Sequence, residues 1–182
     1  MGDHGGVAGM KGTGKQTVRS MMLSMAAIGA VAASVYVFIP HDDSADPIKP
    51  VDYRVELITA RRAAPYPVAA PVGLPETWKP TSVTYDRQDG NSWHLGFLDP
   101  DREYVAVEQS NGPAEKFVHK VSQRATKTEK TLRVGGETWQ RWEGPKYDAL
   151  VCEEKGATTV VTGTASQERL TEMAEALEAK KS

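Results

Sequence analysis

The chain has few of the residues that build disulfide frameworks or structural metal sites. Cys152 is its only cysteine among 182 residues, so no internal disulfide can form. A structural zinc site needs several thiolate or imidazole ligands at short spacing. The histidines do not provide that spacing, because they stand at positions 4, 41, 94 and 119. We therefore expect no metal and no cofactor, and a fold held together by a packed hydrophobic core.

Clustered positive charge and catalytic motifs are also lacking. The chain carries 22 Lys and Arg residues against 24 Asp and Glu residues, and the basic residues are scattered along it. A nucleic-acid surface needs concentrated cationic charge, so we expect no nucleic-acid partner. No Gly-x-Ser-x-Gly nucleophile motif is present. The composition otherwise fits one ordinary domain with accessory segments.

Residues 20–39 lack every charged residue, His, Asn, Gln and Pro; the first and last of them are Ser20 and Ile39. Twenty helical residues span about 30 Å, which matches the hydrocarbon core of a bilayer. Basic residues precede this segment and acidic residues follow it, so the positive-inside rule keeps the N-terminus in the cytoplasm. We expect a single-pass membrane protein, with a basic cytoplasmic tail at 1–19 and an extracytoplasmic C-terminal domain.

Three alternatives concern this N-terminal part. Cleavage at Ala30-Val31-Ala32 would make it a signal peptide, although the apolar stretch is longer than a usual signal core. The small residues Ala26, Ala30 and Ser34 recur every four positions and could support a weak homodimer. The run from 9 to 17 resembles a P-loop, but Gln16 replaces its hydroxyl residue and no βαβ unit surrounds it. We therefore interpret this run as a topology signal.

Residues 40–75 predict a linker or stalk, because the second half is rich in Ala and Pro. Apolar and polar residues alternate at 51–57, which indicates a strand within it. The remaining residues, 76–182, predict an α+β domain. Two meanders of short strands and two one-sided amphipathic helices give the order β-β-β-α-β-β-β-β-α, an antiparallel sheet of about seven strands with two helices packed on it. The closing helix is expected from Ser166 to about residue 179.

Four residues are candidates for a ligand or partner surface: Trp93, His94, Trp139 and Trp142. His94 alternates with apolar residues on its strand, so its side chain points away from the core face. It could make a cross-strand hydrogen bond or act as the base of a hydrolase with Asp99 or Glu108. Trp139 and Trp142 stand three positions apart and therefore point to opposite faces of a strand. Exposed tryptophan often marks a binding surface.

Several segments together resemble the actinobacterial domain of unknown function 4245 family. They are QTVR at 16–19, FIPH at 38–41, WHLGFL at 93–98, EQS at 108–110, GETW at 136–139 and VTGT at 161–164. The resemblance implies a membrane-anchored envelope protein and brings no catalytic assignment. A sheet with a closing helix and the Leu-Pro-x-x-Trp sequence at 74–78 is also similar to PsbP-like envelope domains. We expect a non-catalytic binding module, with an envelope hydrolase that uses His94 as the alternative.

Overall fold

The computed structural model describes residues 14–38, 49–154 and 156–181. They belong to two compact units, Met1–Asp46 and Pro47–Ser182, which we describe separately. Residues 1–13 of the predicted tail and 40–48 of the predicted linker lie outside the described residues.

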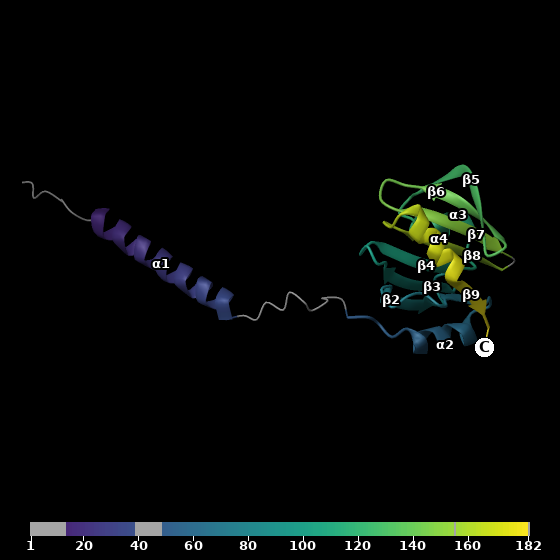
Figure 1. Cartoon of the computed structure of the whole chain (residues 1–182), viewed down its shortest axis with the longest axis horizontal. Helices are drawn as coiled ribbons and strands as arrows, with labels where there is room; N and C mark the ends of the chain where they lie inside the picture. The colour runs from purple at the N-terminus through teal and green to yellow at the C-terminus, as the bar shows by residue number, and fades with distance from the viewer. Residues whose placement is uncertain (1–13, 39–48, 155, 182) are drawn as a thin grey trace, which may run out of the picture. The chain divides into compact units, whose positions relative to one another are not determined.

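The described part of the first unit is one helix, α1 (Gly14–Phe38) (Figure 1). Two serine hydroxyls bond back to the helix: Ser24 donates to the Met21 carbonyl oxygen at 2.9 Å, and Ser34 donates to that of Ala30 at 2.7 Å. Large apolar side chains are exposed along α1: Val18, Met21, Met22, Leu23, Met25, Ile28 and Val31. Within the described part of the chain, no helix combines the length and the apolar character that a membrane crossing requires.

The second unit is built on a seven-stranded antiparallel sheet, as predicted, with the strand order β2-β3-β4-β8-β7-β6-β5. Its strands are β2 (Lys79–Asp86), β3 (Ser92–Leu98), β4 (Tyr104–Ser110), β5 (Thr126–Val134), β6 (Glu137–Glu143), β7 (Asp148–Glu154) and β8 (Ala157–Gly163). The two predicted meanders join through antiparallel pairing of β4 with β8. The α+β class is confirmed, with more helices than predicted.

The hairpin between β5 and β6 turns at Gly135 and Gly136, which have φ values of 61° and 90°. Val134 pairs with Glu137 directly across this two-residue turn. Two successive positive φ angles match the twist of the flanking strands and favour glycine at both positions. The Gly-Gly pair therefore accounts for this tight turn.

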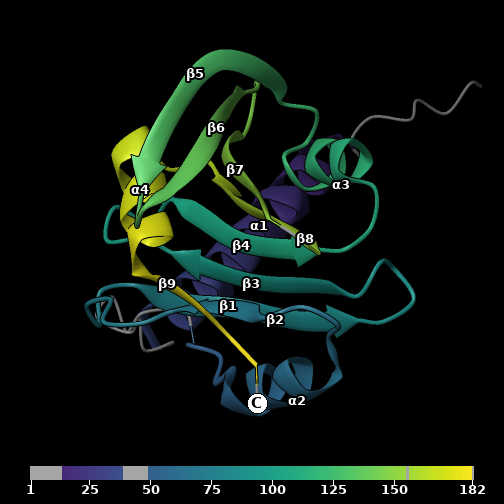
Figure 2. The ribbon, with the colours of Figure 1, turned by 90° about the vertical axis from the view of Figure 1, so that its right-hand side faces the viewer.

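Helices α3 (Ala114–Val121) and α4 (Gln167–Ala176) cover opposite faces of the sheet (Figure 2). α4 packs into the larger core cluster through Leu170 and Met173, which are fully buried together with Trp93. α3 packs into a second cluster on the other face through Phe117 and Val118. The split follows from the alternation of strand side chains: on β8, Val161 belongs to the first cluster and Val160 to the second.

The strand predicted at 51–57 is wrong, because helix α2 (Arg54–Ala63) occupies most of that range. Four alternating apolar residues do not by themselves distinguish a strand from a helix. A helix is favoured when further apolar residues follow at a spacing of three or four. Tyr53, Leu57, Ala60 and Ala64 meet that spacing and pack into the larger core, while Val55 is 69% exposed. The apolar residues beyond Leu57 were therefore the sequence signal that favours a helix over a strand.

The proline-rich segment at 60–75 is part of the globular unit and not a stalk. Strand β1 (Val68–Pro71) pairs antiparallel with β9 (Leu177–Lys180), so the closing helix also ends earlier than predicted, at Ala176. The N–H of Ala69 donates to the Gln109 side-chain oxygen at 2.7 Å, and the Trp93 indole donates to the Ala69 carbonyl oxygen at 3.0 Å. Both polar groups of one backbone residue are thus satisfied by side chains from the sheet.

Replacing Gln109 with Leu should destabilise the protein by about 2–4 kcal/mol, because Ala69 N–H and the Thr159 hydroxyl would lose a buried partner each. Urea unfolding followed by circular dichroism measures the change. The exposed Gln88→Leu variant serves as the control and should stay within about 0.5 kcal/mol of the parent. Equal stability of the two variants would contradict the anchoring role of Gln109.

Candidate functional site

Three polar side chains from neighbouring strands form a hydrogen-bonded chain, which we call the His94 chain. His94 on β3 is the direct partner of Glu108 on β4, and its Nδ1 lies 2.7 Å from Glu108 Oε1. Ser82 on β2 pairs with Gly96, two residues farther along β3, and its Oγ lies 2.8 Å from His94 Nε2. Side chains two residues apart share a sheet face, so the three groups meet on the face that α3 partly covers.

The protonation pattern of the His94 chain follows from its partners. An ionised carboxylate only accepts hydrogen bonds, so Nδ1 of His94 donates to Glu108, and in the neutral imidazole Nε2 accepts from Ser82. The hydrogen bond to Glu108 raises the pKa of His94 above its ordinary value of 6.5, against the opposing effect of burial. The Glu108 side chain is 12% exposed and that of His94 28%, so the carboxylate is held inside while the imidazole reaches the surface.

The Tyr104 hydroxyl lies beside Ser82 Oγ and completes this cluster. Burial raises the pKa of Tyr104 to about 12, with further upward contributions from Glu108 and Tyr147 and an opposing one from Ser82. The phenol therefore stays protonated at neutral pH and can donate a hydrogen bond. Gly96 makes room for the contact, because a Cβ at that position would collide with Ser82 Oγ and approach the Tyr104 hydroxyl to 3.0 Å.

Of the two carboxylates considered for His94, the structure selects Glu108. Asp99 lies in the turn after β3, where its Oδ1 accepts the backbone N–H groups of Asp101 and Glu103, each at 2.8 Å. This is the turn chemistry expected of Asp-Pro-Asp. Ser82 was missed by the sequence reasoning, because no motif connects it with His94; the only signal is that it alternates on a strand that pairs with β3.

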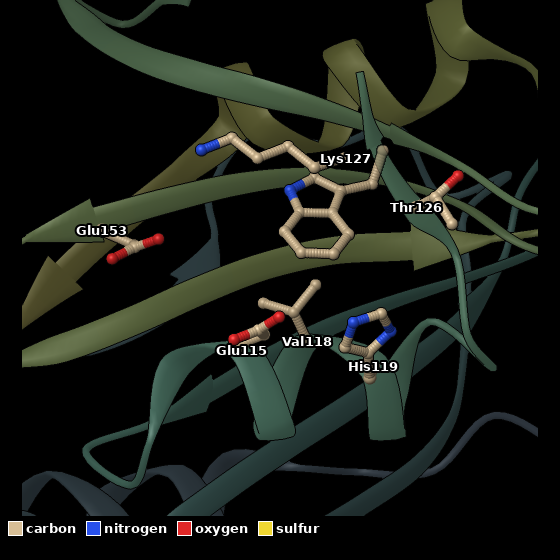
Figure 3. A pocket seen from close by; sticks show the side chains of 7 residues that line it. Glu115, Val118, His119, Thr126, Lys127 and Glu153 are labelled. Atoms are coloured by element: carbon tan, nitrogen blue, oxygen red, sulfur yellow. The ribbon is translucent and has the colours of Figure 1, made fainter. Parts of the chain in front are cut away.

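A second surface feature is a groove of about 450 Å³ beside α3, which we call the Trp142 groove. Figure 3 shows Val118 and His119 projecting from α3 toward Lys127, with Glu115 and Glu153 at one end. Lys127 on β5 and Trp142 on β6 are direct strand partners, so both side chains stand on the α3 face. The lining residues are Glu115, Val118, His119, Thr126, Lys127, Trp142 and Glu153.

Trp142, which lines this groove, carries a buried donor without an acceptor. Trp142 is 7% exposed, and its indole Nε1 has no hydrogen-bond partner. The His119 ring stands edge-on to the indole, with ring centroids 5.5 Å apart. The rim carries charges of both signs, from Glu115 and Glu153 on one hand and Lys127 on the other. Since a buried unpaired donor costs free energy, this position favours a ligand that brings an acceptor.

The other two predicted surface residues lie in the core. Trp93 has no exposed surface, so the prediction that it contributes to a partner surface is wrong. Its indole N–H donates to the Ala69 carbonyl oxygen inside the domain. Trp139 is 5% exposed and packs in the larger cluster, on the face opposite Trp142, as their spacing predicts. A strand residue flanked by polar residues still packs inside when a helix covers its face, and sequence alternation alone does not show which faces are covered.

One group among the described residues has donor atoms placed for a metal ion. Glu137, Cys152 and Glu154 each offer an atom, and these atoms lie within 4.8 Å of one another. Burial raises the pKa of the Cys152 thiol to about 11, with added effects of Glu154, Glu137 and Glu153. The thiol is therefore protonated at neutral pH and is not a reactive thiolate.

The sequence matches the family described as "Protein of unknown function (DUF4245)" over residues 14–177. The chain belongs to this family. No curated protein matches it. The family match covers α1 and nearly all of the second unit, including every residue of the His94 chain and of the Trp142 groove.

Replacing Glu108 with Gln should lower the pKa of His94, because an amide neither carries the charge nor accepts as strongly as the carboxylate that raises it. A raised pKa stabilises the fold below the unfolded-state pKa of about 6.5, and this stabilisation is lost as pH rises through the folded-state pKa. NMR titration of the His94 ring protons measures the shift. Glu115→Gln, in the Trp142 groove, is the matched control and should leave the His94 midpoint in place.

Proposed function

We propose that this protein is a membrane-anchored binding module of a bacterial envelope, and that the Trp142 groove is its ligand site. The observation that carries the proposal is the unpartnered Nε1 of Trp142, a residue that lines a groove of about 450 Å³. Grooves of this size hold small ligands, and a few polar groups over an apolar floor set the orientation of the ligand. A rigid sheet and α3 supply the walls, so the site is formed before binding.

The lining favours a short peptide with free termini. A ligand carbonyl would accept from Trp142 Nε1, an ammonium group would sit near Glu115 and Glu153, and a carboxylate would sit near Lys127. Charges of both signs on one rim fit a zwitterion better than a ligand with charge of a single sign. Val118 and the indole ring provide the apolar contact.

The tripeptide trialanine tests this site on the full chain in detergent micelles. We expect it to shift the Trp142 indole N–H resonance saturably, and we expect N-acetylation or C-amidation of the peptide to weaken binding. Trp142→Phe should lower the affinity about tenfold, as expected for one hydrogen bond to a ligand. Trp139→Phe, on the opposite face, should bind as the parent does. Absence of any shift at millimolar trialanine would overturn the peptide assignment.

The anchor is proposed from residues 20–39. Their uncharged character, the basic residues before them and the acidic residues after them support a single crossing with the N-terminus in the cytoplasm. The exposed apolar side chains of α1 support lipid as their partner, because so much apolar surface on one helix is costly in water. Homodimerisation through Ala26, Ala30 and Ser34 and a PsbP-like topology stay predictions.

An alkaline phosphatase fusion after Ser182 should be active in cells, because this reporter folds only outside the cytoplasm. Replacing Lys11, Lys15 and Arg19 together with Gln should lower that activity, since the orienting charge is removed. A matched triple change at Lys127, Lys130 and Arg133, far from the apolar segment, should not affect it. An inactive fusion with normal expression would contradict the proposed topology.

A further inference from the structure

The His94 chain has the order of groups that activates a serine hydroxyl. Ser82 Oγ, His94 and Glu108 are connected at 2.8 and 2.7 Å, and in the neutral tautomer the free imidazole lone pair faces the hydroxyl. Serine hydrolases use this relation, in which a base takes the hydroxyl proton and a carboxylate orients the base. The triad is recognised by geometry and not by sequence order, so its placement on three neighbouring strands is no obstacle.

The burial of the three side chains in the His94 chain suits these roles. Glu108 is the most buried member, which keeps the orienting carboxylate away from water, while Ser82 and His94 are only partly buried and can meet a substrate. Glu108 is held in place by its position in the middle of the sheet, where β4 pairs with both β3 and β8. Ser82 lies directly after a register shift between Pro80 and Ser82 in β2.

Tyr104 supplies a donor for the negative charge that develops on the substrate. Its hydroxyl lies beside Ser82 Oγ at Gly96, and its raised pKa keeps it protonated through the neutral range. A tyrosine hydroxyl is among the side chains that stabilise the oxyanion in acyl transfer. The absence of a side chain at Gly96 lets Ser82 Oγ and the Tyr104 hydroxyl approach each other over the strand.

We propose that Ser82, His94, Glu108 and Tyr104 form an esterase site on the sheet face beside α3, separate from the Trp142 groove. Ser82 Oγ bonds to the carbonyl carbon of a carboxylic ester while its proton passes to His94 Nε2, and Tyr104 donates to the oxyanion. The bond to the alcohol oxygen then breaks, and the alcohol leaves with the proton from His94. In the second half, His94 takes a proton from water as the water oxygen attacks the acyl carbon. The bond from this carbon to Ser82 Oγ then breaks, His94 returns the proton to Oγ, and the carboxylic acid leaves. Ester and water thus give acid and alcohol.

The pH dependence follows from the role of His94 as a base. The imidazole must be neutral to accept the proton, so turnover should rise with pH through the His94 pKa, which lies above 6.5. Glu108→Gln should lower the rate and move the midpoint of this rise to lower pH. A residue with only a structural role would change the rate without moving the midpoint.

The test uses the full chain in detergent micelles with a fluorophosphonate probe and with p-nitrophenyl acetate. We expect the probe to label Ser82, as identified by peptide mass spectrometry, and Ser82→Ala to abolish labelling. His94→Gln should lower both labelling and ester turnover by about 100-fold or more. Ser92→Ala, a matched serine on β3, should keep the parent rates.

Circular dichroism of each variant separates a loss of chemistry from a loss of fold, and Glu108→Gln provides a second reading through the pH midpoint. The proposal is overturned if the folded parent is not labelled at Ser82, if turnover is unchanged in His94→Gln, or if the Glu108→Gln midpoint stays in place. None of these outcomes bears on trialanine binding in the Trp142 groove.

Discussion

Side chains from the sheet hydrogen-bond both the backbone N–H and the carbonyl oxygen of Ala69. The packing of the proline-rich segment onto the domain depends on these two hydrogen bonds. Gln109 accepts the N–H, Trp93 donates to the carbonyl oxygen, and Gln109 also reaches Thr159 on β8. A proline-rich segment without such partners would leave buried polar groups unpaired and would stay in solvent. With these partners, Tyr66, Val68 and Ala70 become part of the larger core, which also takes in residues of α2, and β1 pairs with β9.

The consequence is a sheet with two different faces. The Trp93 face is covered by α4, α2 and the β1–β9 pair. On the other face, α3 packs with Trp142 of β6, Val151 of β7 and Val160 of β8, and it also contacts β4. Both surface features lie on this second face: the His94 chain on β2, β3 and β4, and the Trp142 groove beside α3. Because side chains alternate along each strand, the Trp93 face forms the main core, and the partly covered opposite face remains available for binding and chemistry.

The strand and helix pattern of the domain could be predicted because its signals are local. Gly135-Gly136 predicts a tight turn, and the apolar spacing of α3 and α4 predicts one buried face on each helix. The exceptions arose where one local pattern fits two structures. Tyr53 and Leu57 satisfy both an alternating strand and a helical face, and only their packing with Ala60 and Ala64 separates the two. In the same way, prolines at 65, 67 and 71 are compatible with a stalk or with a strand at the edge of a small sheet.

By itself, the sequence determined the α+β class, the order along the chain of the seven strands in the main sheet, and the opposite facing of Trp139 and Trp142. It also determined that His94 points away from the core, because alternation on a strand requires it. Only the tertiary structure decided the pairing of β4 with β8, the burial of Trp93 and the meeting of Ser82, His94 and Glu108. These contacts join residues that are distant in the chain, and their geometry depends on strand order and register, which local patterns do not encode.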